Sequence, residues 1–452
     1  MTATQQLHRV LGLGFSLCFG FGNMIGVGIL RLPGLVAAAA GTPTLILICW
    51  CVGGLYTLMG AVSLSELAAM YPEAGGFRVY VRRAFGERAG FVVGWVDWLA
   101  CAATISYAAV TAVEFAGTLW PPVLEHERSA AIGVLVVFAA VHSVGLRAGS
   151  SLTASCSVAI GISLLLVVGA CLLAAPPVPP RAAVAAVAPA VVASGSLLML
   201  APAVRAIVTA YDGWYAPIYT AEETTNAGKL LPRALIGAAL MTTVLYLLVN
   251  IALLRVLPVP VLAASELPVA VAADLVLPHG SAAPITVLSI LIVLGLINAN
   301  SLMAPRVLFS MAREGWVPSA AMRLSPGGTP WVGLVATMAV AAAMILSGTF
   351  NRLISLFAVL ILLYYIAAFM AVFALRRRLP NAPRPYRAFG YPISTAVVLL
   401  GSVGFLLAAI FDDWGAAVTA LVFLSLCVPA YALAARSRRT TAPAAAGIPR
   451  AG

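Results

Sequence analysis

The sequence predicts an all-α polytopic membrane protein with twelve transmembrane helices. Hydrophobic residues make up 62% of the 452 residues and charged residues only 9%, and the mean hydropathy is +1.04. A soluble domain carries roughly a quarter charged residues, because it needs a hydrated surface. Apolar runs long enough to cross about 30 Å of hydrocarbon as helices recur along the chain. Continuous runs such as ITVLSILIVLGL contradict a β-barrel, whose strands alternate in polarity.

Short polar or Pro/Gly-containing linkers separate the apolar segments. The expected spans are residues 11–40, 43–70, 89–119, 130–148, 151–174, 193–221, 234–257, 281–312, 331–348, 352–375, 393–411 and 415–435. The first is too long for the apolar core of a signal peptide, so we expect no cleaved leader. Residues 1–10 are expected to form a cytoplasmic N-terminus, and residues 436–452 a disordered cytoplasmic tail.

The distribution of positive charge predicts the orientation. If the N-terminus is cytoplasmic, 20 of the 26 Lys and Arg residues fall on the inner side, whereas the outer loops carry acidic residues such as Glu125 and Asp274. Cytoplasmic loops are enriched in Lys and Arg, so we expect a multi-pass protein of the plasma (inner) membrane with both termini cytoplasmic. Lys229, the only lysine, falls in an expected cytoplasmic loop.

Several classes of function lack their sequence signals. The seven cysteines all lie in apolar segments and the four histidines form no cluster, so neither a metal site nor a cofactor is expected. The net charge of +11 comes mainly from arginines at the ends of apolar runs, and nucleic acid is not an expected partner. Because no catalytic constellation, channel filter or ATP-binding P-loop occurs, we expect neither an enzyme, a channel nor an ATP-driven pump.

Two spans are expected to unwind near their middle. The first carries Gly26-Val27-Gly28, and the sixth carries Tyr211-Asp212-Gly213-Trp214 followed by Tyr215-Ala216-Pro217. Each is the first of a set of five spans, and interrupted helices paired in this way indicate an inverted-repeat transporter with its site near the midplane. The alternative, in which the glycines only pack helices together, stays open.

An interrupted helix offers backbone groups to a zwitterion. The N–H groups that begin the second half-helix favour a carboxylate, and carbonyls at the end of the first half can accept from an ammonium group. The predicted substrate-binding residues are Ile25, Gly26, Val27, Gly28, Ile29, Tyr211, Asp212, Gly213 and Trp214. Such a site selects amino acids as a class, since every amino acid carries both charges.

Five segments occur in an order that resembles the amino acid–polyamine–organocation (APC) superfamily. They are MIGVGILRLPG, YPEAGGFRVYVRRAFGERAGFVVGW, YDGW with AEETTNAGKLLPRA, NANSLMAPRVLFSMAREGWVP and LRRRLPNAPRPYRAFGYP, and together they cover most of the chain. The resemblance implies a LeuT-like five-plus-five inverted repeat, residues 11–175 and 193–375, with two additional helices in 393–435. It also implies alternating access, with the solute bound between spans 1, 3, 6, 8 and 10.

The resemblance also bears on substrate and coupling. Tyr-Asp-Gly-Trp is similar to the L-type and serine/threonine exchanger branches, which implies a neutral amino acid moved by proton symport or exchange. A cationic amino acid or polyamine antiporter is the alternative. Three positions depart from the family pattern: Val27 replaces a frequent Ser, Thr or Ala, Ile160 replaces a lysine of span 5, and Thr209 replaces an aromatic gate. No partner subunit is required, and homo-oligomerisation stays open.

Ionisable and polar residues inside spans are candidates for coupling or gating, because they are costly in lipid. For Asp212 a helix cap is favoured over contact with a substrate amine or a proton. For Asp97 a fixed ion pair near the inner gate is favoured over proton binding. Arg31 and Arg205 face an outer vestibule or pair with Asp97 or Glu114 of span 3. The remaining candidates are Thr209, Tyr215, Asn298 and Asn300, together with inner salt bridges of Glu222, Glu223 and Arg233.

Overall fold

The computed structural model describes residues 9–144, 146–174, 200–277, 282–326, 328–348 and 350–441. Within these ranges the secondary structure is helical, apart from two isolated β-bridges. The α-helices are α1 (Leu13–Met24), α2 (Val27–Ala40), α3 (Pro43–Met70), α4 (Phe77–Phe85), α5 (Glu87–Leu119), α6 (Glu127–Val144), α7 (Leu146–Leu173), α9 (Ala201–Ala210), α10 (Ala227–Val256), α11 (Val259–Ala264), α12 (Pro268–Val276), α13 (Ala282–Arg313), α14 (Trp331–Ser347), α15 (Phe350–Arg378), α16 (Ile393–Asp412), α17 (Trp414–Ser425) and α18 (Cys427–Thr441). The 3₁₀ helices are η1 (Pro121–His126), η3 (Ala216–Glu223) and η4 (Ser319–Met322).

The prediction of a helical multi-pass membrane protein is confirmed. In the described part of the chain, seven helical segments are long and apolar enough to cross a membrane, and four shorter apolar helices accompany them. The long segments are Leu13–Ala40, Pro43–Met70, Glu87–Leu119, Ala227–Val256, Ala283–Arg313, Leu353–Arg378 and Ile393–Phe411. A total of twelve spans and the inverted repeat stay predictions.

Several expected boundaries differ from the structure. Residues 436–441 continue α18 and are not a disordered tail, because the run of alanines and arginines before them favours helix. The twelfth expected span is divided between α17 and α18. Lys229 lies in the first turn of α10 and not in a loop. Residues 1–8 of the expected N-terminus, 193–199 of the sixth span and 442–452 of the tail lie outside the described residues.

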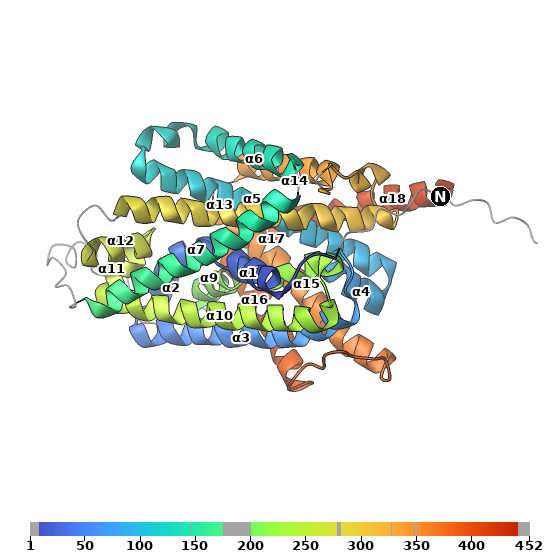
Figure 1. The fold of residues 1–452 in the computed structure, drawn as a ribbon, viewed down its shortest axis with the longest axis horizontal. Coiled ribbons are helices and arrows are strands. Elements are labelled where there is room, and N and C mark those ends of the chain that lie inside the picture. The colour runs from blue at the N-terminus through green and yellow to red at the C-terminus, as the bar shows by residue number, and fades with distance from the viewer. Residues whose placement is uncertain are drawn as a thin grey trace, which may run out of the picture.

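The long helices run beside one another along the long axis of the molecule (Figure 1). Helix α4 lies towards one end, and α11 and α12 lie at the other. Helix α5 is the innermost of the long spans, since 89% of its most apolar window is buried, compared with 22% for α16. It packs against α4, α13, α14 and α15, so polar residues of α5 lie inside the protein and not against lipid.

Candidate functional site

The first span is interrupted where the glycine motif predicts it. Helix α1 ends at Met24, the N–H of Ile25 still donates to the carbonyl of Phe21 at 3.1 Å, and α2 begins at Val27. The first N–H groups of an α-helix have no partner within that helix. The start of α2 therefore presents both free backbone N–H groups and the positive end of its helix dipole to the protein interior.

The sixth span is interrupted by a series of turns. Helix α9 ends at Ala210, residues 211–215 form turns, and the chain continues as the 3₁₀ helix η3. Gly213 has a φ of +104°, which an L side chain rarely adopts. Pro217 follows near the start of η3, where its missing N–H costs nothing. The second half of this span is therefore a 3₁₀ helix, and not the α-helix expected.

The two interruptions pack directly against each other. A Cβ added to Gly28 would lie 2.7 Å from the Cα of Ala210, and one added to Gly213 would lie 2.7 Å from the carbonyl oxygen of Asn23. No side chain fits at either position without moving a backbone. Glycine is therefore needed for the contact between the two broken segments as well as for the breaks themselves.

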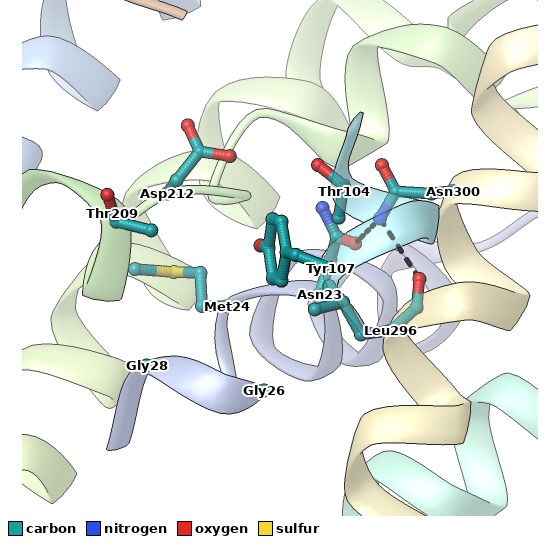
Figure 2. A pocket seen from close by; sticks show the side chains of 10 residues that line it. All are labelled: Asn23, Met24, Gly26, Gly28, Thr104, Tyr107, Thr209, Asp212, Leu296 and Asn300. Atoms are coloured by element: carbon teal, nitrogen blue, oxygen red, sulfur yellow. Dashed lines mark hydrogen bonds between the residues drawn. The ribbon is translucent and has the colours of Figure 1, made fainter. Parts of the chain in front are cut away.

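A small cavity lies at this junction (Figure 2). Its volume is about 10 Å³, room for about one water molecule. The ten described residues that line it come from α1, α2, α5, α9, α13 and the turns after α9: Asn23, Met24, Gly26, Gly28, Thr104, Tyr107, Thr209, Asp212, Leu296 and Asn300. Asp212 is the one acidic residue among these ten. The cavity therefore combines backbone at the start of α2 with one carboxylate.

Two tyrosines hold the Asp212 carboxylate. The hydroxyl of Tyr365 donates to Oδ1 at 2.6 Å, and that of Tyr215 donates to Oδ2 at 2.8 Å. Helix η3 begins after Tyr215 and has no side-chain cap, so the expected capping role of Asp212 is wrong. Tyr215 directly precedes η3, and Tyr365 lies in α15. The carboxylate reaches both tyrosines because the turn at Gly213 directs it into the protein interior.

An amide pair forms the opposite wall. Asn300 Nδ2 donates to Asn23 Oδ1 at 3.2 Å and to the carbonyl of Leu296 at 3.0 Å. Asn23 Nδ2 in turn donates to the carbonyl of Gly213 at 3.4 Å. In the view of Figure 2, Asn23 and Asn300 lie on one side, Asp212 and Thr209 on the other, and Tyr107 between them. This network joins α13 to both interruptions.

Four of the predicted substrate-site and gate residues line the cavity: Gly26, Gly28, Thr209 and Asp212. Ile25 and Ile29 are fully buried in packing contacts, and the side chain of Val27 lies outside the described part of the structure. Tyr211 and Trp214 are also buried, with Tyr211 packed on Trp50 and Tyr246 and Trp214 packed on Tyr365. Gly213 contacts Asn23.

The other predicted coupling and gate residues do not line the cavity. Arg31 pairs with Glu114, and its guanidinium lies 4.0 Å from the carboxylate of Glu266. Of the two alternatives expected for Arg31, pairing within the protein is therefore the one observed. Arg205 donates to Ser355 of α15 at 2.9 Å. Oδ1 of Asn298 lies 2.8 Å from Nε2 of His142, which makes it an interhelical contact between α13 and α6.

The prediction that Asp97 forms a fixed ion pair is wrong, since no cation of the described residues pairs with it. Its Oδ1 accepts from the Tyr219 hydroxyl at 2.5 Å, and its Oδ2 has no hydrogen-bond partner there. The nearby cation Arg78 is held by Ser310 and Glu314. A carboxylate that is 1% exposed thus lies inside the protein with a phenol as its partner.

Salt bridges form at the C-terminal end of η3, as expected for two of the three residues. Glu223 pairs with Arg306 at 3.0 Å, with both side chains 2% exposed, and Glu222 pairs with Arg313 at 3.1 Å. Arg233 forms no salt bridge with any described residue.

Sequence reasoning omitted Asn23, Met24, Thr104, Tyr107 and Leu296 from the site, and weighed Asn300 without selecting it. The available signal was the polar residues Asn23, Thr104 and Tyr107 in otherwise apolar spans.

Comparison with known proteins assigns this chain to a family. The model of the family described as Amino acid permease matches residues 11–433. The chain is 29% identical over 414 residues to the serine/threonine exchanger SteT of Bacillus subtilis, which covers 89% of this chain and 91% of that protein. It is 25% identical over 428 residues to the b(0,+)-type amino acid transporter 1 of Mus musculus, covering 91% and 84%. It is 28% identical over 395 residues to the large neutral amino acids transporter small subunit 2 of Homo sapiens, covering 84% and 72%.

Proposed function

This chain belongs to the amino acid permease family, and we propose that it is a secondary active transporter that carries a neutral amino acid by alternating access. The membership confirms the resemblance to APC permeases. The observation that carries the proposal is the cavity between the two interrupted spans, which combines the start of α2 with the Asp212 carboxylate. Relatives described as an exchanger and as amino acid transporters support the substrate class.

In the proposed complex, the substrate carboxylate binds the N–H groups around Val27 and Gly28, and the ammonium group approaches Asp212. The backbone donors of α2 are preorganised, because they belong to a rigid helix and need no side-chain rotation. One acidic residue in the cavity matches one ammonium group. Thr104, Tyr107 and Leu296 would then contact the substrate side chain, and their mixed polarity favours a neutral one.

The proposed topology follows the charge pattern and the family. It has twelve spans, with residues 11–175 and 193–375 as inverted repeats and 393–435 as additional helices. Both termini are placed in the cytoplasm and the protein in the plasma membrane. On this orientation the pairs Glu223–Arg306 and Glu222–Arg313 lie on the cytoplasmic side of the cavity and close it from within.

Uptake into liposomes tests the proposal. Purified protein is reconstituted and offered a panel of labelled amino acids, with and without unlabelled solute inside, and with an inward proton gradient. Uptake that requires internal solute would establish exchange, in agreement with Ile160 at the position of the family lysine. Uptake driven by the gradient would establish proton symport. Failure to transport any amino acid, with intact protein, would contradict the proposal.

A cationic amino acid or polyamine antiporter is the second candidate, because Asp212 gives the cavity a negative charge. The same panel separates the two functions. Arginine, lysine and a polyamine such as putrescine would compete with the labelled substrate if the second were correct. Alanine, serine and leucine would compete if the first were correct.

A further inference from the structure

A second cavity lies at the beginning of α10, outside the substrate site. One wall is formed by Lys229, Arg233, Ile236 and Gly237 of α10, and the other by Pro385 and Tyr386 of the loop after α15. Its volume is about 610 Å³, and it is therefore a wide groove. None of its lining residues takes part in the cavity at Asp212.

The groove carries two positive charges that pair with no carboxylate of the described residues. Lys229 and Arg233 are four residues apart in one helix, so their side chains lie on the same face and repel each other. Both are exposed, and neither forms a salt bridge within 4.0 Å of a carboxylate in the described part of the chain. By contrast, Arg306 and Arg313 at the inner end of α13 are both paired with glutamates. The arrangement of Lys229 and Arg233 is complementary to an anion.

The charged face of α10 continues as an apolar stripe. At helical spacing from Arg233 follow Gly237, then Leu240 and Val244, each 50% exposed. Exposed apolar side chains on a spanning helix contact lipid acyl chains. The two cations therefore mark the point where the lipid-facing surface of α10 meets the membrane interface.

We propose that this groove binds the phosphate of an anionic phospholipid. Lys229 and Arg233 hold the phosphate, and an acyl chain lies along Gly237, Leu240 and Val244. The side chain of Tyr386 lies where aromatic residues favour the interface. Clusters of Lys and Arg next to spanning helices attract anionic headgroups. A free phosphate shares the headgroup chemistry, but only a lipid also covers the apolar stripe.

Native mass spectrometry of the full chain in neutral detergent tests this proposal. The probes are dioleoylphosphatidylglycerol and dioleoylphosphatidylcholine, with thermal unfolding in inorganic phosphate as a third measurement. We expect one phosphatidylglycerol to stay bound and to raise the Tm, whereas phosphatidylcholine and inorganic phosphate do neither. In the double variant Lys229→Gln/Arg233→Gln, the affinity for phosphatidylglycerol should fall about 25-fold, because the loss of each cation lowers it about fivefold.

The matched control is Arg88→Gln/Arg323→Gln, which removes the same charge from two exposed arginines outside the groove. It should bind phosphatidylglycerol as the unmodified protein does. Equal binding by the Lys229/Arg233 variant, or by phosphatidylcholine, would overturn the proposal. Protection by inorganic phosphate alone, equal to that by the lipid, would replace it with a free-anion site. Each variant is compared in Tm without lipid, so that a folding defect is recognised.

Discussion

The hydroxyl of Tyr246 donates a 2.6 Å hydrogen bond to the carbonyl oxygen of Met24, the last residue of α1. The same hydroxyl lies 3.1 Å from the carbonyl oxygen of Ala210, the last residue of α9. The single proton of this hydroxyl is therefore within reach of carbonyls freed at both interruptions. Unpaired carbonyls cost several kcal/mol in a medium without water. Tyr246 therefore stabilises the ends of α1 and α9 at both interruptions.

Tyr246→Phe should therefore impair transport more than folding. The substitution leaves two buried carbonyls with one fewer donor, at a cost of about 1–3 kcal/mol. We expect the Tm to fall by a few degrees and the initial rate of uptake to fall at least tenfold, because both interruptions loosen. The control Tyr431→Phe removes a hydroxyl from a ring that packs on Phe91 and Trp316. Equal rates for the two variants would contradict this role of Tyr246.

Asp212→Asn should abolish binding of the substrate ammonium group while preserving the fold. An amide of the same shape can accept from one of the two tyrosines through its oxygen and donate to the hydroxyl oxygen of the other through its nitrogen, so the local geometry is retained. We expect the KM for the transported amino acid to rise at least tenfold. Tyr365→Phe, which removes one donor from the carboxylate, should have a smaller effect in the same direction. An unchanged KM for Asp212→Asn would place the substrate amine elsewhere.

Gly28→Leu should abolish uptake without preventing membrane insertion. Its Cβ would lie 2.7 Å from the Cα and 2.9 Å from the carbonyl oxygen of Ala210, so α2 and α9 must separate. Gly169→Leu on α7 is a suitable control, because no described atom lies within 4 Å of the added Cβ. Wild-type uptake by Gly28→Leu would exclude a substrate site at this junction.

Arg306→Gln should destabilise the protein more than Arg313→Gln. Both arginines pair with glutamates, but the Glu223–Arg306 pair is 2% exposed on both sides, whereas Arg313 is 38% exposed. Removing one partner of a buried pair leaves an uncompensated charge and costs about 3–5 kcal/mol, compared with about 0–1 kcal/mol at a surface. Thermal unfolding measures the difference. The double variant Glu223→Gln/Arg306→Gln should recover part of the loss, and equal effects of the two single variants would contradict the assignment.

The positions of the interruptions could be predicted from the sequence, but the rest of the cavity could not. Gly26-Val27-Gly28 and Asp212-Gly213 are unusual within apolar spans, and the chain unwinds at both. Thr104 and Tyr107 are polar residues of an apolar span, but α5 is buried on nearly all sides, so its sequence does not indicate which of its faces meets the cavity. The capping role expected for Asp212 failed because its carboxylate is held by two tyrosines, and one of them, Tyr365, lies 153 residues away in the chain. A local pattern contains no information on that contact.

Asp97→Asn should separate proton-driven uptake from solute exchange. The carboxylate of Asp97 is 1% exposed, and no described cation pairs with it. An isolated charge is costly in a spanning helix, so this carboxyl group is a candidate carrier of the coupled proton. An asparagine would keep the bond from Tyr219 and remove the proton. We expect exchange at close to the wild-type rate and loss of uptake driven by a proton gradient, both measured in the same liposomes. Proton-driven uptake that survives in Asp97→Asn would exclude this residue as the coupling site and leave Asp212 as the remaining candidate.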